Sequence, residues 1–153
     1  TLNVGDQRAT PVTGAVKEHI NPEMISILDA PPGTACPMQE TVEDSDYCIL
    51  VTEPTPFGLS NLGDAVETCR KLGVPAGVVI NRDGVGDRGV DEYCRDEGID
   101  ILLRIPQERA IAEAYSRGQS LVAAMPEYED RLLDMYDLVT SAIHADRNRQ
   151  GVI

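Results

Sequence analysis

Continuous apolar runs alternate with segments of helical spacing along this chain. Tyr47 to Thr52 (Y-C-I-L-V-T) is one such run, typical of a parallel strand covered on both faces. Similar runs predict buried strands at residues 25–28, 76–80 and 99–105, with a short edge strand at 2–4. Apolar residues recurring every three or four positions predict helices at residues 59–72, 107–117 and 126–145. Shorter helices are expected at residues 12–20, at 38–45, which is acidic, and at 89–97, which is polar.

Strands that alternate with helices at this spacing predict βαβ units. Right-handed crossovers then give a parallel sheet with helices on both faces, a three-layer α/β/α fold. The 153 residues suit one domain spanning residues 1–153, and no internal repeat is visible. Gly73 and Pro75 end the helix at 59–72. We expect the chain to fray from Arg147 onward.

The charge balance is strongly acidic, with 26 acidic and 13 basic residues and a net charge of -13. This argues against binding to nucleic acid or to an anionic membrane. No apolar run approaches the roughly 20 residues that span a bilayer, and no signal peptide is visible, so we expect a cytoplasmic protein. The last helix is acidic, which weighs against MinD-like membrane attachment.

The four cysteines are widely spaced and include no C-x-x-C pair. Their spacing matches neither a zinc ribbon nor a ferredoxin-type cluster motif. It favours a protein whose cysteines stay reduced in an intracellular compartment. Cys48 and Cys69 lie among apolar neighbours and are expected in the core, whereas the role of Cys36 stays open. His19 and His144 are expected at the surface.

The stretch I-S-I-L-D-A-P-P-G-T at residues 25–34 is the first candidate for chemistry. A short buried strand would deliver Asp29 at its carboxyl end, and a tight turn follows. In nucleotide hydrolases an Asp at this place holds Mg²⁺ directly or through water. The alternative is a strand that ends in an ordinary turn containing Asp.

The other predicted strands end at the same edge of the sheet, where a ligand would contact Glu53, Asn81 to Asp83, and Pro106 with Gln107. The amide of Asn81 could pair with a donor and an acceptor on a base edge. A guanine reader of the N-K-x-D type would need an Asp at position 84, which is Gly84 here, so adenine fits better. Alternatively, Asn81 is a turn residue.

Two further motifs bear on the nucleotide. Residues 84–89 match the dinucleotide-binding motif G-x-G-x-x-G. Two features argue against a dinucleotide site: the next strand does not end in the required acidic residue, and the following helix looks short and polar rather than packed on a sheet. No G-x-x-x-x-G-K-[ST] loop occurs, and the two lysines, Lys17 and Lys71, follow no glycine-rich turn. This chain alone is therefore expected to bind nucleotide weakly or not at all, and not to hydrolyse it.

Several motifs occur in a specific order: D-A-P-P-G at 29–33, E-P-T-P-F-G-L at 53–59, V-V-I-N-R at 78–82 and A-E-A-Y-S-R-G at 112–118. In this order the chain resembles the MinD/ParA superfamily of P-loop ATPases over about residues 1–122. It looks most similar to the branch of the CobQ/CobB/MinD/ParA group that carries an inserted ferredoxin domain. The D-x-P-P-G turn is shared with the Mrp-type iron–sulfur carriers.

The resemblance implies that the chain is the carboxyl-terminal half of such an ATPase. The Walker A loop and two 4Fe-4S clusters would then lie upstream of Thr1. Asp29 would be the catalytic carboxylate near Mg²⁺. The remaining nucleotide contacts implied by the family are Pro31, Pro32 and Gly33 in the phosphate-sensing turn, Asn81 and Arg82 on the adenine side, and Pro106 beside the base.

In this family the Walker A strand lies between the strand that bears Asp29 and the strand at Tyr47. Without it, those two strands must pair with each other, or a partner must fill the gap, because apolar edges aggregate. A homodimer is therefore expected, and an iron–sulfur or redox protein is a further expected partner. The expected function is part of an ATPase coupled to electron transfer or iron–sulfur chemistry. The alternatives are a non-catalytic interaction domain with a vestigial nucleotide site and an Mrp-type cluster carrier.

Overall fold

The computed structural model describes residues 9–33 and 36–150, so the strand predicted at residues 2–4 lies outside the described part. In chain order the elements are α1 (Ala9–Lys17), α2 (Cys36–Val42), β1 (Cys48–Thr52), α3 (Pro56–Leu72), β2 (Ala76–Asp83), α4 (Gly89–Glu97), β3 (Ile101–Pro106), α5 (Arg109–Ser116), α6 (Leu121–Ala124) and α7 (Tyr128–Gln150). Helix α6 was not predicted from the sequence.

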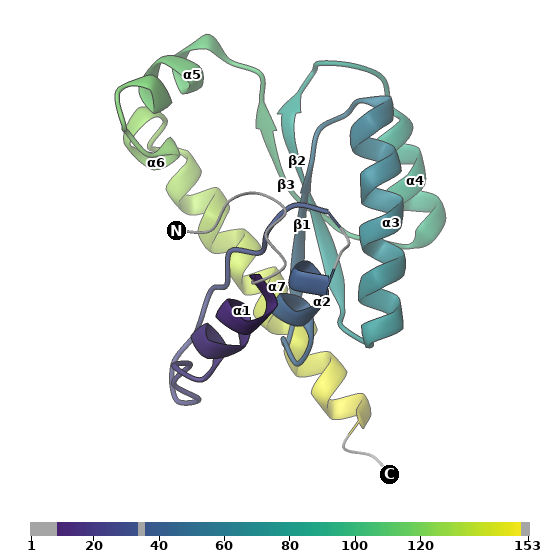
Figure 1. Cartoon of the computed structure of the whole chain (residues 1–153). Coiled ribbons are helices and arrows are strands. Elements are labelled where there is room, and N and C mark those ends of the chain that lie inside the picture. Colours follow the sequence, from purple (N-terminus) through teal and green to yellow (C-terminus); the bar gives the residue numbers. More distant parts are fainter. Residues whose placement is uncertain (1–8, 34–35, 151–153) are drawn as a thin grey trace.

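The sheet consists of three parallel strands in the order β1-β2-β3 (Figure 1). Helices α3 and α4 lie on one side of it, and the long helix α7 crosses the other side. The predicted α/β architecture with helices on both faces is therefore confirmed. Because all strands are parallel, their carboxyl ends lie along one edge, at the top of Figure 1.

The core lies mainly between the sheet and helices α2, α3 and α4. Leu50, Val78 and Ile80 pack there against buried side chains of the helices, among them Leu62 and Cys69. A smaller cluster on the opposite face joins the sheet to α6 and α7. The central strand β2 is buried on both faces, as its uninterrupted apolar run predicted.

Local signals set the boundaries of α3. The side chain of Thr55 accepts a hydrogen bond from the backbone N–H of Gly58, and Pro56 occupies the first turn. Gly73 adopts a left-handed conformation (φ 70°) after the last turn, which confirms the predicted cap. The helix begins before residue 59 because the capping residues precede the first apolar position.

The prediction of a strand at residues 25–28 is wrong. The segment belongs to no ladder among the described residues, and Ile25 and Ile27 are largely exposed. The expectation that β1 is covered on both faces is also wrong, since Ile49 and Val51 are exposed. An apolar run becomes a strand only when a neighbouring backbone pairs with it. Among the described residues, no strand lies beside β1 on the side away from β2, and residues 25–28 pair with no strand.

Two helices differ from expectation. Helix α4 packs on the sheet through Val90 and Cys94, although its composition is polar. Helix α7 continues to Gln150, past the point where fraying was predicted. Arg147 there forms an ion pair of 2.6 Å with Asp46, which joins the end of α7 to the start of β1.

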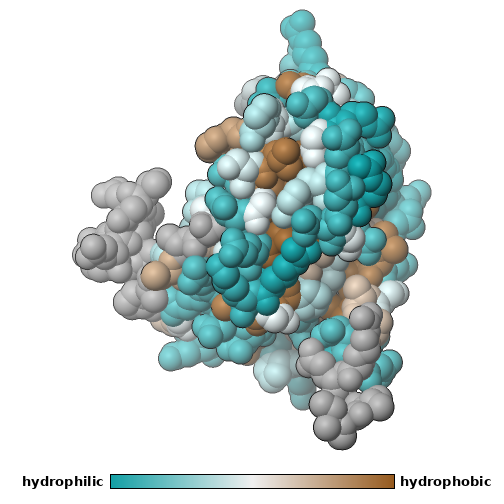
Figure 2. Space-filling model, turned by 90° about the vertical axis from the view of Figure 1, so that its right-hand side faces the viewer, coloured by the Kyte–Doolittle hydropathy of each residue, from teal (hydrophilic) through white to brown (hydrophobic). Residues whose placement is uncertain are grey.

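The side of the molecule that carries α3 and α4 is mostly hydrophilic, with a narrow apolar strip (Figure 2). Ion pairs such as Arg70 with Glu97, and Lys71 with Glu67, lie on the outer surfaces of these helices. Within the described ranges, none of the helices combines the length and the apolar character needed to cross a bilayer.

Candidate nucleotide-binding rim

Three strand ends form the candidate site, which we call the rim: Glu53 after β1, Asn81 to Asp83 at the end of β2, and Pro106 with Gln107 at the end of β3. The register pairs Asp83 with Pro106, and the N–H of Gln107 donates to the carbonyl of Asp83 at 3.0 Å. The structure thus brings Asn81, Arg82 and Pro106 to one edge, as the strand pattern predicted.

Arg82 connects all three strand ends. Its Nε donates to Oε1 of Gln107 at 2.8 Å, and its Nη1 lies 3.4 Å from the carboxylate of Glu53. The backbone of Arg82 has a φ of 54°, a left-handed conformation that costs a residue with a side chain about 1–2 kcal/mol. The two side-chain contacts help to offset this cost and fix the turn that follows Asn81.

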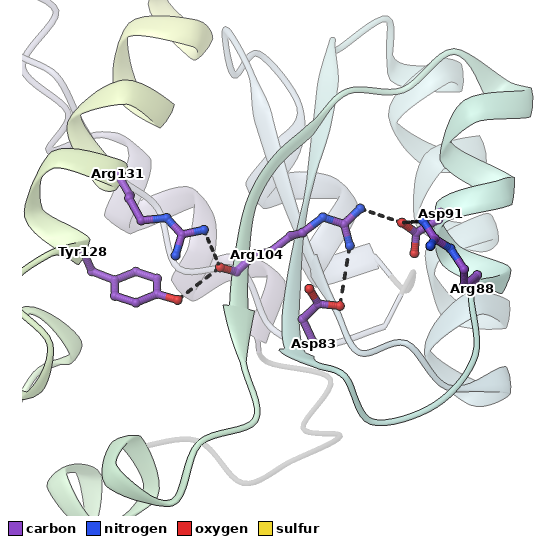
Figure 3. A network of polar contacts seen from close by, with 6 residues as sticks. All are labelled: Asp83, Arg88, Asp91, Arg104, Tyr128 and Arg131. Carbon is purple, nitrogen blue, oxygen red and sulfur yellow. Dashed lines mark hydrogen bonds and ion pairs between the residues drawn. The ribbon is translucent and has the colours of Figure 1, made fainter.

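A second polar network joins the rim to the preceding part of β3 and to α4 (Figure 3). The guanidinium of Arg104, on β3, donates to Asp91 of α4 at 2.6 Å and lies 3.5 Å from Asp83. Burial acts to lower the pKa of Arg104, but the hydrogen bonds to Asp91 and Asp83 and the charges of these two carboxylates together outweigh it, so the pKa of Arg104 is raised. Sequence analysis missed this network, because only the folded chain brings β3 and α4 together.

The backbone of Arg104 is also the anchor for α7. Its carbonyl accepts hydrogen bonds from the hydroxyl of Tyr128 at 3.3 Å and from Nη2 of Arg131 at 3.2 Å (Figure 3). The guanidinium of Arg131 lies 4.6 Å from the centroid of the Tyr128 ring, a cation–π contact. Tyr128 is buried, so β3 is held from both sides directly beneath the rim.

The Asp29 loop lies apart from the rim. It borders a cleft of about 280 Å³, whose lining residues are Thr13, Val16, Lys17, Ile27, Leu28, Asp29, Pro31 and Thr41. Asp29, Pro31, Pro32 and Gly33 are all exposed. None of the residues that line this cleft is a rim residue.

Lys17, the cation of this cleft, is already engaged. Its ammonium donates to the backbone carbonyl of Glu40 at 2.7 Å and also to that of Glu43, around the carboxyl end of α2. These carbonyls carry the negative end of the helix dipole. Lys17 therefore stabilises the end of α2 rather than offering a free charge for a phosphate.

The G-x-G-x-x-G stretch has a packing role in this structure. A Cβ atom at Gly86 would lie 1.8 Å from the carbonyl oxygen of Pro54, and the φ of Gly86 is 133°. The loop can approach the end of β1 this closely only because position 86 is glycine. The backbone N–H of Gly89, the first residue of α4, donates to the carboxylate of Asp87 at 2.9 Å.

The rim and the Asp29 cleft differ in the chemical groups that they offer to a ligand. At the rim, the half-buried amide of Asn81 has the donor and acceptor that the edge of a base could pair with. Pro106 and Arg82 lie at neighbouring strand ends, where they could contact the face of the base. The Asp29 cleft has one exposed carboxylate, that of Asp29, and a lysine, Lys17, that already donates to backbone carbonyls. Among the described residues, no group of three or more His, Cys, Asp or Glu lies close enough to hold a metal ion.

Comparison with known proteins gives sequence relatives and one shared fold. An uncharacterized protein of Methanocaldococcus jannaschii is 30% identical over 123 residues, covering 78% of this chain and 42% of that protein. The iron–sulfur cluster carrier protein of Pyrococcus furiosus is 29% identical over 135 residues, covering 75% of this chain and 46% of the relative. The chain thus spans less than half the length of these relatives. No protein-family model matches it.

A crystal structure of a ParA family ATPase from Chlorobium tepidum superposes with a TM-score of 0.51 at 24% identity, covering 71% of this chain and 46% of that one. This likeness confirms the P-loop NTPase-like fold. Together with the iron–sulfur carrier relatives, it confirms the resemblance to the MinD/ParA superfamily that was read from the motifs.

Proposed function

We propose that this chain is the part of a MinD/ParA-type ATPase that holds the base of the nucleotide, and that the complete ATPase handles iron–sulfur clusters. The observation that carries the nucleotide proposal is the rim, where Asn81, Arg82 and Pro106 meet at adjoining strand ends. The iron–sulfur part is supported by relatives named as iron–sulfur cluster carriers.

Each rim residue has a defined task in this proposal. The amide of Asn81 pairs with the edge of adenine, and Pro106 flanks the ring. Arg82, held by Glu53 and Gln107, keeps the turn after Asn81 in place. These are binding and positioning roles.

The phosphates and Mg²⁺ need groups beyond the described residues. Mg²⁺ is usually bound through one or two carboxylates together with substrate phosphates, and Asp29 would supply one carboxylate. With Lys17 engaged by α2, the remaining charge and the phosphate-binding loop must come from another segment. No hydrolytic step follows from this chain's own residues. The two 4Fe-4S clusters of the ferredoxin-bearing branch would likewise be held elsewhere.

A second candidate function is a non-catalytic interaction domain with an incomplete nucleotide site. The position of Asp29 on an exposed loop, outside the sheet, favours it. The two candidate functions predict different results when the missing phosphate-binding segment is supplied. An ATPase part would then bind ATP, whereas an interaction domain would not.

Calorimetry with ATP and Mg²⁺ separates these candidates. It would compare the chain alone with a fusion to the portion of the Pyrococcus furiosus carrier that it does not match. We expect binding only by the fusion, and Asn81→Ala to weaken it about tenfold through loss of the hydrogen bonds to the base. Asn148→Ala, on the exposed end of α7, is the matched control. Absence of binding by the fusion would reject the ATPase proposal.

The iron–sulfur role has its own test. The fusion, reconstituted anaerobically with ferrous iron and sulfide, should transfer a cluster to an apo-ferredoxin. If ATP binding is intact and no transfer occurs, only the iron–sulfur part of the proposal is rejected.

A further inference from the structure

Two cysteines from different elements lie together at the amino end of β1. The N–H of Cys48 donates to the carbonyl of Pro75 at 2.9 Å, and the N–H of Val74 donates to the carbonyl of Cys69 at 3.0 Å. Because Val74 and Pro75 are consecutive, these two hydrogen bonds bring the first residue of β1 close to the last turn of α3.

The side chains of these cysteines meet in the main core. Cys69 is 1% exposed and belongs to the core cluster, and the half-buried Cys48 packs against the same cluster. The Cys48 thiol donates a hydrogen bond to the sulfur of Cys69, and this bond lowers the pKa of Cys69. The two sulfur atoms are therefore in direct contact, and neither belongs to a disulfide bond.

We propose that Cys48 and Cys69 are a redox pair, whose thiols are converted by a small-molecule disulfide of the glutathione class into an intramolecular disulfide bond. An excess of the corresponding small thiol reverses the reaction. Disulfide bonds in reducing compartments are usually transient and redox-sensing, a role that suits two free thiols in contact. The pairing does not depend on nucleotide, and it stands or falls separately from the proposed ATPase.

The disulfide bond forms in two exchange steps. The thiolate of the half-buried Cys48 attacks one sulfur of the small disulfide, so that a mixed disulfide forms and one small thiolate leaves. The thiolate of Cys69 then attacks the Cys48 sulfur, forms the protein disulfide and releases the second small thiolate. The two leaving thiolates take up the two protons that the protein thiols lose. The cysteines are oxidised by two electrons, and the small disulfide is reduced to two thiols.

The bond closes the unit formed by β1 and α3. These elements run side by side in opposite directions (Figure 1), and the turn that contains Glu53 joins them at the rim. Cys48 and Cys69 lie at the other end of the unit, away from the rim. A cross-link there restricts the unfolded chain and holds β1 against α3 at both ends. We therefore expect the oxidised chain to unfold at a higher urea concentration than the reduced chain.

Mass spectrometry of the folded chain tests the pair. In a Cys36→Ser background, which removes an exposed thiol, the chain is treated with oxidised glutathione in the absence of denaturant. We expect a loss of about 2 Da, the mass of the two hydrogen atoms removed. Digestion after Glu67, which lies between the two cysteines, should leave the fragments bearing Cys48 and Cys69 joined until a reductant is added. An unmodified chain, a stable glutathione adduct, or a bond from Cys69 to Cys94 would overturn the proposal.

Two variants in the same background separate the redox pair from simple core packing. Cys48→Ser keeps a small polar group at a half-buried position, so the fold is retained, and it should form no intramolecular bond. Cys94→Ala is the matched control, because Cys94 is also 1% exposed in the core, and it should still form the bond between Cys48 and Cys69.

Urea unfolding gives a second measurement on the same proteins. Oxidation should raise the urea midpoint of the parent and of Cys94→Ala, and it should leave the midpoint of Cys48→Ser unchanged. An equal rise in Cys48→Ser would show that other thiols react, and a midpoint of the parent that does not rise would show that no bond closes the unit of β1 and α3. Either result would overturn the proposal.

Discussion

The guanidinium of Arg104 lies 2.6 Å from the carboxylate of Asp91, and this ion pair joins the last strand of the sheet to helix α4. The side chain of Asp91 is only 18% exposed. The same guanidinium reaches Asp83 at the end of β2. One side chain thus fixes the relative positions of two strands and a helix immediately below the rim.

Replacing Arg104 should destabilise the fold. We expect Arg104→Met to lower the free energy of unfolding by about 1–3 kcal/mol, because it leaves the partly buried carboxylate of Asp91 without its main partner. Urea denaturation followed by circular dichroism measures this change. Arg88→Met is the control, since Arg88 also contacts Asp91, but at 3.5 Å and with its side chain 83% exposed. Its cost should stay below about 0.5 kcal/mol, and equal costs would contradict the assigned role.

The loop at residues 84–89 should tolerate no side chain at Gly86. We expect Gly86→Ala to cost about 2–4 kcal/mol, because a Cβ would collide with the carbonyl of Pro54 and the φ of 133° is strained for alanine. Gly98→Ala is the matched comparison, with a left-handed φ of 66° but open space around it, and should cost about 1–2 kcal/mol. Thermal unfolding of both variants would reveal the difference; equal losses would exclude the steric explanation.

The two faces of β1 should respond differently to truncation. Leu50→Ala removes a buried side chain from the main core and should cost about 2–4 kcal/mol. Val51→Ala, on the uncovered face, should cost less than about 1 kcal/mol at protein concentrations where the chain is monomeric. Chemical denaturation of dilute samples checks both values, and a large loss for Val51→Ala there would mean that another part of the chain covers this face.

Stability should fall in alkaline solution through Cys94. Burial raises the pKa of the Cys94 thiol above its ordinary value of 9.0, and the nearby carboxylate of Asp91 adds to the effect. The folded chain then keeps a proton that the unfolded chain releases, so this contribution is complete below pH 9.0 and is lost as pH rises through the raised pKa.

Urea midpoints between neutral and alkaline pH test this assignment. Wild-type stability should decline as the solution becomes alkaline, with a slope from this one thiol of at most about 1.4 kcal/mol per pH unit. Cys94→Ala should start from a lower stability, because it leaves a cavity, but decline less steeply. Identical slopes in the two proteins would assign the decline to other groups.

Much of the fold could be predicted because its determinants lie close together in the sequence. The limits of α3 follow from Thr55 and Gly73, each of which satisfies backbone groups within a turn of its own position. Strand β2 follows from an apolar run that is buried wherever the sheet forms. The rim follows from the rule that parallel strands end at one edge, which predicts that Asn81 and Pro106 lie at the same edge of the sheet.

What the tertiary structure alone decided concerns partners distant in the sequence. Residues 25–28 have the composition of a buried strand, yet a strand exists only when another backbone pairs with it, and no local pattern reveals whether that partner is present. The polar composition of α4 hid Val90 and Cys94, which are buried because Arg104 and the sheet lie beneath them. The sequence by itself determined most of the helices and strands, their order and the resemblance to a family. The tertiary structure decided which strand edges are paired and which charged side chains meet, because these contacts depend on distances that arise only when the chain folds.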